Sequence, residues 1–216
     1  MGVSVLFTVS KMDAGPIVSQ KEEMIDENDD ATKLLPYLFD IGTQSLLEVI
    51  PDVVNGKITM ENSLVQDDAL IVNADMISSA EGELRVWKES ARECHNKIRG
   101  FSMWPGTFLY FAIEDDNDDN GGGEEVVEVV EPTKVKIIES KVIGEAGSVD
   151  PTHEVTLGPT KKSGLHLVCG DGSVLELLKV QPVTRKAMDA KSFVNGLRGK
   201  TLRWVEMPEE PVVDDE

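Results

Sequence analysis

Two short stretches of the sequence carry residue types that could do chemistry. Residues 11–17 read KMDAGPI, so that one carboxylate, that of Asp13, enters a tight turn. Such a carboxylate can take up and release a proton, although an aspartate that only caps the turn explains the pattern equally well. Residues 96–107 read NKIRGFSMWPGT and join a basic helix end to a Phe/Trp/Pro bend and then to a strand. By itself this second stretch indicates a structural connection between a helix and a strand, in which the aromatic side chains fill the bend.

The other chemically versatile residues form no recognisable site. The three histidines have no metal-ligand spacing among themselves or with the two cysteines, so we expect no metal site. Cys94 and Cys169 lie 75 positions apart, which excludes a disulfide framework or a zinc knuckle. The glycines at 121–123 lack the Gly-Lys-Ser/Thr ending of a phosphate-binding loop, and no Gly-x-Ser-x-Gly signature is present. The sequence therefore holds no complete catalytic constellation.

A strand, a turn and a helix should position the first stretch. Alternating apolar residues predict a strand over 3–9, and the turn that follows leads into a second extended piece at 17–19. Asp30 or Thr32 can cap a helix that runs to about Ile50, with an apolar face made by Leu35, Leu38, Phe39, Leu46, Val49 and Ile50.

The second stretch should lie between a helix and a run of short strands. A helix is predicted over 87–99, because four apolar residues follow a helical spacing: Trp87, Ala91, Cys94 and Ile98. A hairpin is predicted at Gly170-Asp171-Gly172, because Asp-Gly tolerates a positive φ. The predicted strands cover 107–113, 134–142, 165–169 and 173–180, and a last helix covers 187–195 and ends at Gly196. This order predicts a small closed barrel.

The charge of the chain is unevenly distributed. With 40 acidic and 21 basic residues the net charge is −19, which at face value argues against a nucleic-acid partner. However, 21 of the acidic residues lie in three stretches at 21–30, 114–131 and 206–216, which hold only one lysine. Without these stretches the net charge is +1, and residues 151–205 alone carry +5. The distribution is therefore compatible with a nucleic-acid partner, and the acidic runs indicate solvated linker, insertion and tail.

Taken together and in this order, the motifs resemble those of the methionyl-tRNA formyltransferase family. The family's Gly-Val-Thr stretch leading into Asp-x-Gly is similar to Gly2-Val3-Ser4 and Asp13-Ala14-Gly15. Its Ile-Arg-Ala/Gly-Phe-x-x-Trp-Pro-Gly motif is similar to residues 98–106, which read IRGFSMWPG. Its Asp-Gly-x-Leu hairpin and its closing Gln-Pro-x-Gly-Lys-Lys-x-Met…Phe-x-Asn-Gly motif resemble residues 170–175, 181–188 and 193–196. The resemblance spans about 2–205, with 114–131 as an insertion.

The resemblance implies an α+β fold with two parts. Residues 1–58 would be a remnant of a Rossmann-like α/β formyltransferase domain, and residues 59–80 a linker. A C-terminal OB-like β-barrel that binds tRNA would follow at 81–205, with the acidic insertion 114–131 and an acidic tail at 206–216.

The implied reaction transfers a formyl group from 10-formyltetrahydrofolate to the amino group of initiator methionyl-tRNA. Asp13 aligns with the family's catalytic aspartate, which orients a histidine and manages protons. The Asn-x-His-x-Ser-Leu-Leu-Pro stretch, which carries the catalytic Asn and His, is missing, and the main walls of the folate pocket are missing with it. Since loss of one oxyanion donor costs about 10²–10³ in rate, we expect the chain alone to be inactive. A first strand without neighbours on its sheet would favour a truncated enzyme over a genuine short form.

The resemblance also gives an RNA-facing role to basic residues of the C-terminal region, although scattered solubilising charges remain an alternative. The candidates are Lys97, Arg99, Arg185, Lys186, Arg198, Lys200 and Arg203. Two other functions remain open: a non-catalytic tRNA- or RNA-binding module, and a related formyltransferase with a different acceptor, against which the run at 181–188 argues. We further expect a monomer without a membrane partner, located in a mitochondrion or chloroplast because of the family's role in organellar translation.

Overall fold

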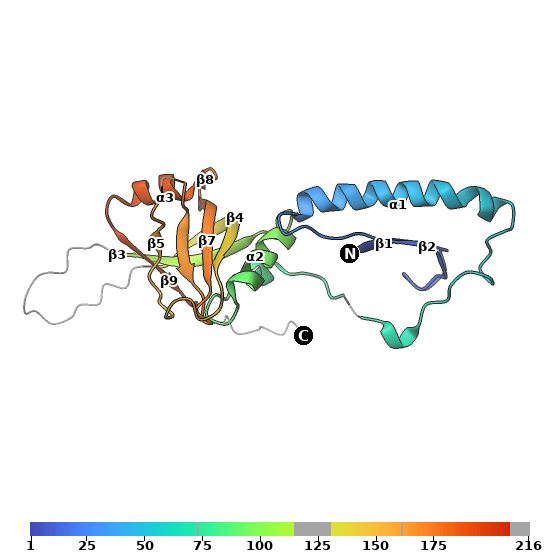
Figure 1. Cartoon of the computed structure of the whole chain (residues 1–216), viewed down its shortest axis with the longest axis horizontal. Coiled ribbons are helices and arrows are strands. Elements are labelled where there is room, and N and C mark those ends of the chain that lie inside the picture. Colours follow the sequence, from blue (N-terminus) through green and yellow to red (C-terminus); the bar gives the residue numbers. More distant parts are fainter. Residues whose placement is uncertain (73, 115–130, 161, 208–216) are drawn as a thin grey trace, which may run out of the picture. The chain divides into compact units, whose positions relative to one another are not determined.

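The computed structural model describes residues 1–72, 74–114, 131–160 and 162–207, and its internal contacts divide the chain into two units (Figure 1). Unit 1 is Met1–Met76 and unit 2 is Ile77–Glu216. All but the two end residues of the acidic insertion expected at 114–131 lie outside the described residues, as does most of the acidic tail expected at 206–216.

Unit 1 consists of a β-hairpin and one long helix. Strand β1 (Gly2–Leu6) pairs antiparallel with β2 (Ile17–Glu22), with Val5 opposite Ser19. The prediction that the first strand would lack a neighbour is therefore wrong, because the extended piece recognised at 17–19 continues to Glu22 as β2 and pairs along all of β1. A parallel, Rossmann-like sheet is not shown, since the described strands of this unit form a single antiparallel pair.

Helix α1 (Ala31–Val54) confirms the helix predicted after Asp30 and extends four residues beyond Ile50. The Asp30 side chain caps it by accepting a hydrogen bond from the backbone N–H of Lys33 at 3.1 Å. On its predicted apolar face Leu38 is buried, but Phe39 is 75% exposed. The described hairpin therefore covers only part of the apolar surface that the helix presents. A short 3₁₀ helix at Asp68–Leu70 follows in the same unit.

Unit 2 begins with a 3₁₀ helix at Ser79–Gly82 and helix α2 (Ala91–Gly100). The helix was predicted to begin at Trp87, but a capping box formed by Ser90 and Glu93 begins it later: the Ser90 hydroxyl accepts from the Glu93 N–H at 3.2 Å, and the Glu93 carboxylate accepts from the Ser90 N–H at 2.7 Å. These hydrogen bonds from the Ser90 backbone and side chain lower the pKa of Glu93.

In the described part of unit 2, seven antiparallel strands follow and form the barrel. The sheet order is β5-β6-β7-β4-β3-β9, and β8 pairs with β7. The strands are β3 (Thr107–Glu114), β4 (Thr133–Gly144), β5 (Thr156–Leu157), β6 (Leu165–Val168), β7 (Val174–Pro182), β8 (Met188–Asp189) and β9 (Thr201–Val205). The four predicted strands correspond to β3, β4, β6 and β7.

Two backbone hydrogen bonds bring the ends of this sheet together. The Val155 N–H donates to the Leu202 carbonyl at 2.8 Å, and the Trp204 N–H donates to the His153 carbonyl at 2.9 Å. Strand β9, which pairs with β3, thus also pairs with the segment directly before β5. The sheet is therefore a nearly closed barrel, as the sequence predicts.

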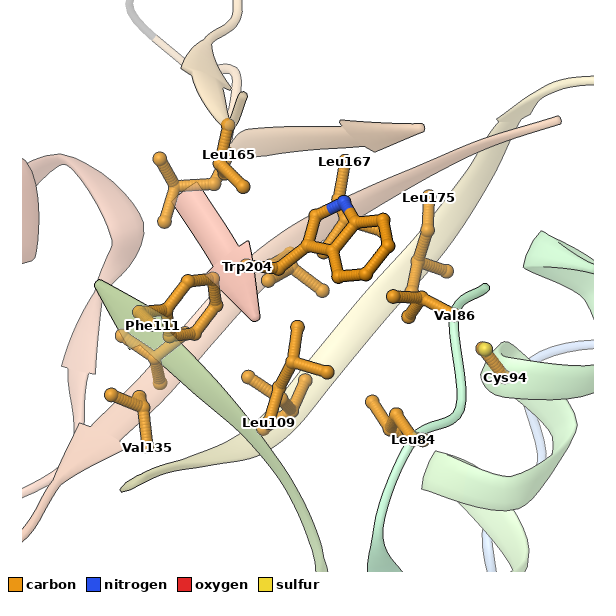
Figure 2. Close-up of a cluster of buried hydrophobic side chains, with 14 of the residues drawn as sticks. Leu84, Val86, Cys94, Leu109, Phe111, Val135, Leu165, Leu167, Leu175 and Trp204 are labelled. Atoms are coloured by element: carbon orange, nitrogen blue, oxygen red, sulfur yellow. The ribbon is translucent and has the colours of Figure 1, made fainter. Parts of the chain in front are cut away.

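Trp204 lies in the centre of the barrel core (Figure 2). Its side chain is 4% exposed and lies among leucines of several strands. The indole stacks on Trp87 at 6.0 Å between ring centroids and on His153 at 3.9 Å. Its Nε1–H donates to the Thr152 carbonyl at 3.1 Å, so the one polar atom of the ring is satisfied.

The two cysteines lie in the same core as free thiols. Hydrogen bonding to Cys169, together with burial, raises the pKa of the Cys94 thiol. Both effects disfavour the thiolate, so Cys94 behaves as a small apolar core residue and not as a nucleophile.

The β6–β7 hairpin at 170–172 is confirmed, with Gly172 at φ 76°. The Ser173 hydroxyl donates to Asp171 at 2.5 Å and lowers the pKa of that carboxyl. The same hydroxyl accepts from the Ala91 N–H at 2.8 Å, which fastens the beginning of α2 to the hairpin.

The last helix, α3 (Ala190–Leu197), differs from the predicted 187–195 at both ends. Residues 188–189 form β8 instead, and Asp189 caps the helix through the Ser192 N–H. The helix passes Gly196 and ends at Leu197, and its C-cap residue Arg198 takes the left-handed conformation at φ 57°. No helix in the described part of the chain is long and apolar enough to cross a bilayer.

Candidate functional site

Asp13 lies in the connection between β1 and β2, exposed and in a left-handed backbone conformation at φ 53°. The Phe7 N–H donates to the Pro16 carbonyl at 3.0 Å and closes this connection. Gly15 is buried against the same backbone, where a Cβ atom would lie 1.6 Å from the Phe7 carbonyl oxygen. Only glycine fits there, so the Asp-x-Gly pattern holds the Asp13 carboxylate outward on a tightly packed turn.

Gln66 fastens this turn from a distant part of the sequence. Its Nε2 donates to the carbonyl of Asp13 at 2.7 Å and to that of Gly15 at 2.8 Å. Next to it, Leu64 and Ile17 exchange two backbone hydrogen bonds of 2.8 and 3.2 Å. The sequence does not reveal this role. Gln66 lies in a stretch whose apolar residues follow no regular spacing, and such a stretch is typical of a linker.

Replacing Gln66 with alanine is expected to loosen the Asp13 turn without unfolding unit 1. Two neutral hydrogen bonds contribute about 1–3 kcal/mol together, so local opening should rise by about 5- to 150-fold. Hydrogen exchange of the amides of residues 13–15 and 17, followed by mass spectrometry, measures this change. Gln44→Ala, at an exposed position of α1, is the matched control. Equal exchange in both variants would show that Gln66 does not hold the turn.

The described residues of unit 1 do not fit a folate donor next to Asp13. An apolar cavity of about 180 Å³ lies between the hairpin and α1, smaller than the usual 300–1,000 Å³ of a ligand site. A more polar hollow of about 560 Å³ lies along the beginning of β1 and the end of β2. Asp13 lines neither of them. No residue of this chain is therefore assigned to the donor.

Two of the candidate RNA-binding residues lie on α2 and are engaged within unit 2. Lys97 is largely buried; its ammonium donates to the Glu89 carboxylate and, at 3.1 Å, to the Glu83 carbonyl. Arg99 donates to the Asn96 side chain at 2.9 Å. These contacts hold Lys97 in an internal ion pair, where it is poorly placed to meet a phosphate.

Four other candidates lie around the C-terminal end of α3. Arg185 and Lys186 are exposed in the turn between β7 and β8, and neither makes an ion pair with a described residue. The Arg185 guanidinium lies 3.9 Å from the position that a Cβ on Gly196 of α3 would take. Arg198 and Lys200 follow directly and are exposed. We call Arg185, Lys186, Arg198 and Lys200 the α3 basic cluster.

The candidates do not form one continuous stripe. Figure 1 shows α2 and α3 on different sides of the barrel, so Lys97 and Arg99 are not brought together with the α3 basic cluster. Arg203 lies on the outer face of β9, 3.9 Å from the Glu114 carboxylate.

The histidines have structural partners. His95 shares a 2.9 Å hydrogen bond with Ser140, His153 stacks on Trp204, and His166 lies 3.5 Å from the buried Glu176. Among the described residues no group of three or more His, Cys, Asp or Glu side chains is arranged to hold a metal ion.

Sequence reasoning missed a group of aromatic and basic residues on the outer face of β3 and β4. Phe108 and Tyr110 point away from the core that Leu109 and Phe111 enter. In the strand register, Lys136 is opposite Phe108, and Lys134 is opposite Tyr110. The alternation of both predicted strands would have placed these residues on outer faces, but the sequence does not fix the register.

Comparison with known proteins identifies the family. The model of the formyl transferase C-terminal domain matches residues 76–198. Methionyl-tRNA formyltransferase of Listeria innocua is 30% identical over 208 residues, which are 95% of this chain and 58% of the relative. The Bacillus subtilis protein of that name is 29% identical over 195 residues, 90% of this chain and 53% of the relative. The chain thus spans little more than half the length of these curated relatives.

A solved structure supports the fold. A substituted variant of HypX from Aquifex aeolicus superposes on 92% of this chain and 31% of its own length with a TM-score of 0.59, at 12% identity. At this identity the likeness concerns the fold alone. Because the domain model covers more than half of the sequence, the chain belongs to the formyl transferase family.

Proposed function

We propose that this chain acts in the formylation of initiator methionyl-tRNA, as the part of a methionyl-tRNA formyltransferase that holds the tRNA. The observation that carries the proposal is the match to curated methionyl-tRNA formyltransferases over 95% of the chain. The α3 basic cluster supports it, because Arg185 and Lys186 are exposed and make no ion pair with a described residue, which suits them to phosphate contacts. An organellar location and a monomeric state stay predictions.

In the proposed reaction the neutral methionine amine attacks the formyl carbonyl of 10-formyltetrahydrofolate, an oxyanion develops, and the amine loses a proton. Within this chain only Asp13 aligns with a catalytic group of the family, as the residue that orients a histidine and manages protons. The catalytic Asn and His and the folate pocket are assigned to polypeptide that this chain does not contain. We further propose that unit 1 corresponds to the last part of the Rossmann-like formyltransferase domain.

Binding of initiator tRNA by the full chain tests the proposal. The logarithm of the binding constant should fall linearly with the logarithm of the salt concentration, by about 0.7–0.9 for each phosphate contact. The double variant Arg185→Ala/Lys186→Ala should bind about tenfold more weakly and lose about 1.5 from this slope. Titration of labelled tRNA at several salt concentrations measures both quantities.

The double variant Lys88→Ala/Lys162→Ala removes the same charge from exposed positions outside the cluster and is the matched control. It should bind tRNA like the wild-type chain. Equal weakening in both double variants would mean that net charge alone attracts the tRNA, and would contradict a role for the α3 basic cluster. Absence of tRNA binding by the wild-type chain would contradict the proposed function itself.

A further inference from the structure

The bend before β3 presents a large aromatic side chain to solvent. Trp104 is 59% exposed and its neighbour Met103 is 60% exposed. Met103 and Pro105 share a hollow of about 260 Å³ with Lys136 of β4. The exposed indole thus belongs to a bend that lies beside a lysine of the neighbouring strand.

Two lysines continue from this bend along β4. Lys134 and Lys136 lie on the outer face, two residues and therefore about 7 Å apart. The Lys134 ammonium lies 3.5 Å above the centre of the Phe108 ring, which holds it in place, and Phe108 meets Tyr110 edge-to-face at 5.7 Å. Lys136 is exposed and makes no ion pair with any described residue. We call Trp104, Phe108, Tyr110, Lys134 and Lys136 the β3–β4 strip.

We propose that the β3–β4 strip binds an unpaired segment of RNA, with one base stacked on Trp104 and neighbouring phosphates next to Lys136 and Lys134. The inference rests on the proposed function for the class of partner, and it adds a second contact region to the α3 basic cluster. It specifies that the bound segment of RNA is unpaired, which phosphate contacts at the α3 basic cluster do not.

The chemistry of the strip favours unpaired RNA over a duplex and over an apolar protein surface. An indole can stack only on a base whose face is free, and such faces are offered by loops and single-stranded ends. Base–aromatic stacking beside a row of cations is the usual way in which β-barrels bind single strands. An apolar protein partner would bury Trp104 and Met103 but would leave Lys136 next to the interface without an anion.

Tryptophan fluorescence can report this site selectively. The other two tryptophans, Trp87 and Trp204, stack on each other, and Trp204 lies in the core. Titration of the full chain with a single-stranded RNA oligonucleotide should therefore quench the fluorescence of Trp104. A duplex RNA of the same length should quench it much less at equal occupancy, which a fluorophore on the RNA reports independently.

Three variants test the assignment. Trp104→Phe should lose the quenching but bind the oligonucleotide within about threefold of the wild-type affinity, because phenylalanine still stacks. Trp104→Ala should bind about tenfold more weakly. Lys134→Ala/Lys136→Ala should weaken binding and reduce its salt dependence, whereas Lys88→Ala/Lys162→Ala should change neither.

Unchanged binding by Trp104→Ala, or quenching that persists in Trp104→Phe, would overturn the inference. If Trp104→Ala binds tRNA normally while Arg185→Ala/Lys186→Ala does not, the strip is no RNA site and the proposed function stands. If the oligonucleotide binds at Trp104 but initiator tRNA does not bind at all, the inference stands and the proposed function falls.

Discussion

Asp13→Asn is expected to lower the rate of formylation by about 10²–10⁴ when the chain works together with a polypeptide that carries the rest of the family's formyltransferase domain. Asparagine keeps the size of the side chain and tolerates the positive φ of this position, so the turn should keep its shape. What the variant loses is a carboxylate that can accept a proton. Formation of formylmethionyl-tRNA from 10-formyltetrahydrofolate measures the change.

The complementing polypeptide would be the part of the Listeria innocua relative outside the 58% that matches this chain. Without it we expect no formylation above background, because two of the family's three catalytic groups are not in the sequence. Asp40→Asn, at an exposed position of α1, is the matched control and should leave the rate unchanged. A fully active Asp13→Asn variant would remove Asp13 from the mechanism. Formylation by the chain alone would contradict the assignment of the donor site to other polypeptide.

Trp204→Ala is expected to destabilise the barrel by about 3–5 kcal/mol. The side chain fills the centre of the core, and the same residue lies on the strand that closes the sheet. A domain of this size has only about 5–15 kcal/mol of unfolding free energy, so the loss takes a large share of it. Urea unfolding followed by circular dichroism measures the difference without depending on tryptophan fluorescence.

Trp104→Ala provides the control for this measurement. It removes the same side chain from an exposed position, where substitutions usually change stability by less than about 0.5 kcal/mol. Similar midpoints for the two variants would show that Trp204 does not organise the core.

Long elements with local signals could be predicted from the sequence. The cap at Asp30, the Asp-Gly turn at 170–172 and the alternating strands at 107–113 and 134–142 are each encoded within a few residues. Errors arose where two local signals compete. Trp87 fits the spacing of α2, yet the Ser90–Glu93 capping box begins that helix later. Gly196 was predicted to end the last helix, but α3 continues to Leu197 and is followed by the left-handed Arg198.

Features that depend on distant pairing could not be predicted. Strands β5 and β8, with two residues each, are too short to show a period, and they form because the barrel offers them edges. Strand β9 has five residues that alternate between buried and outer positions, but it was not predicted. In the same way, the sequence around Gln66 does not predict that its side chain holds the Asp13 turn. The separation of Lys97 from the α3 basic cluster also follows from the course of the chain around the barrel and not from local sequence.

The closure of the barrel by β9 has a consequence for its folding during synthesis. Residues 201–205 must pair with both β3 and residues 153–155, so the last strand joins partners made long before it. Ribosomes add about 5–20 residues per second, which leaves the earlier strands waiting for seconds with two unpaired edges. The nascent chain should therefore depend most on chaperones during that interval, and a translational pause that holds residues 201–205 inside the ribosome should raise aggregation more than a pause after these residues have left it.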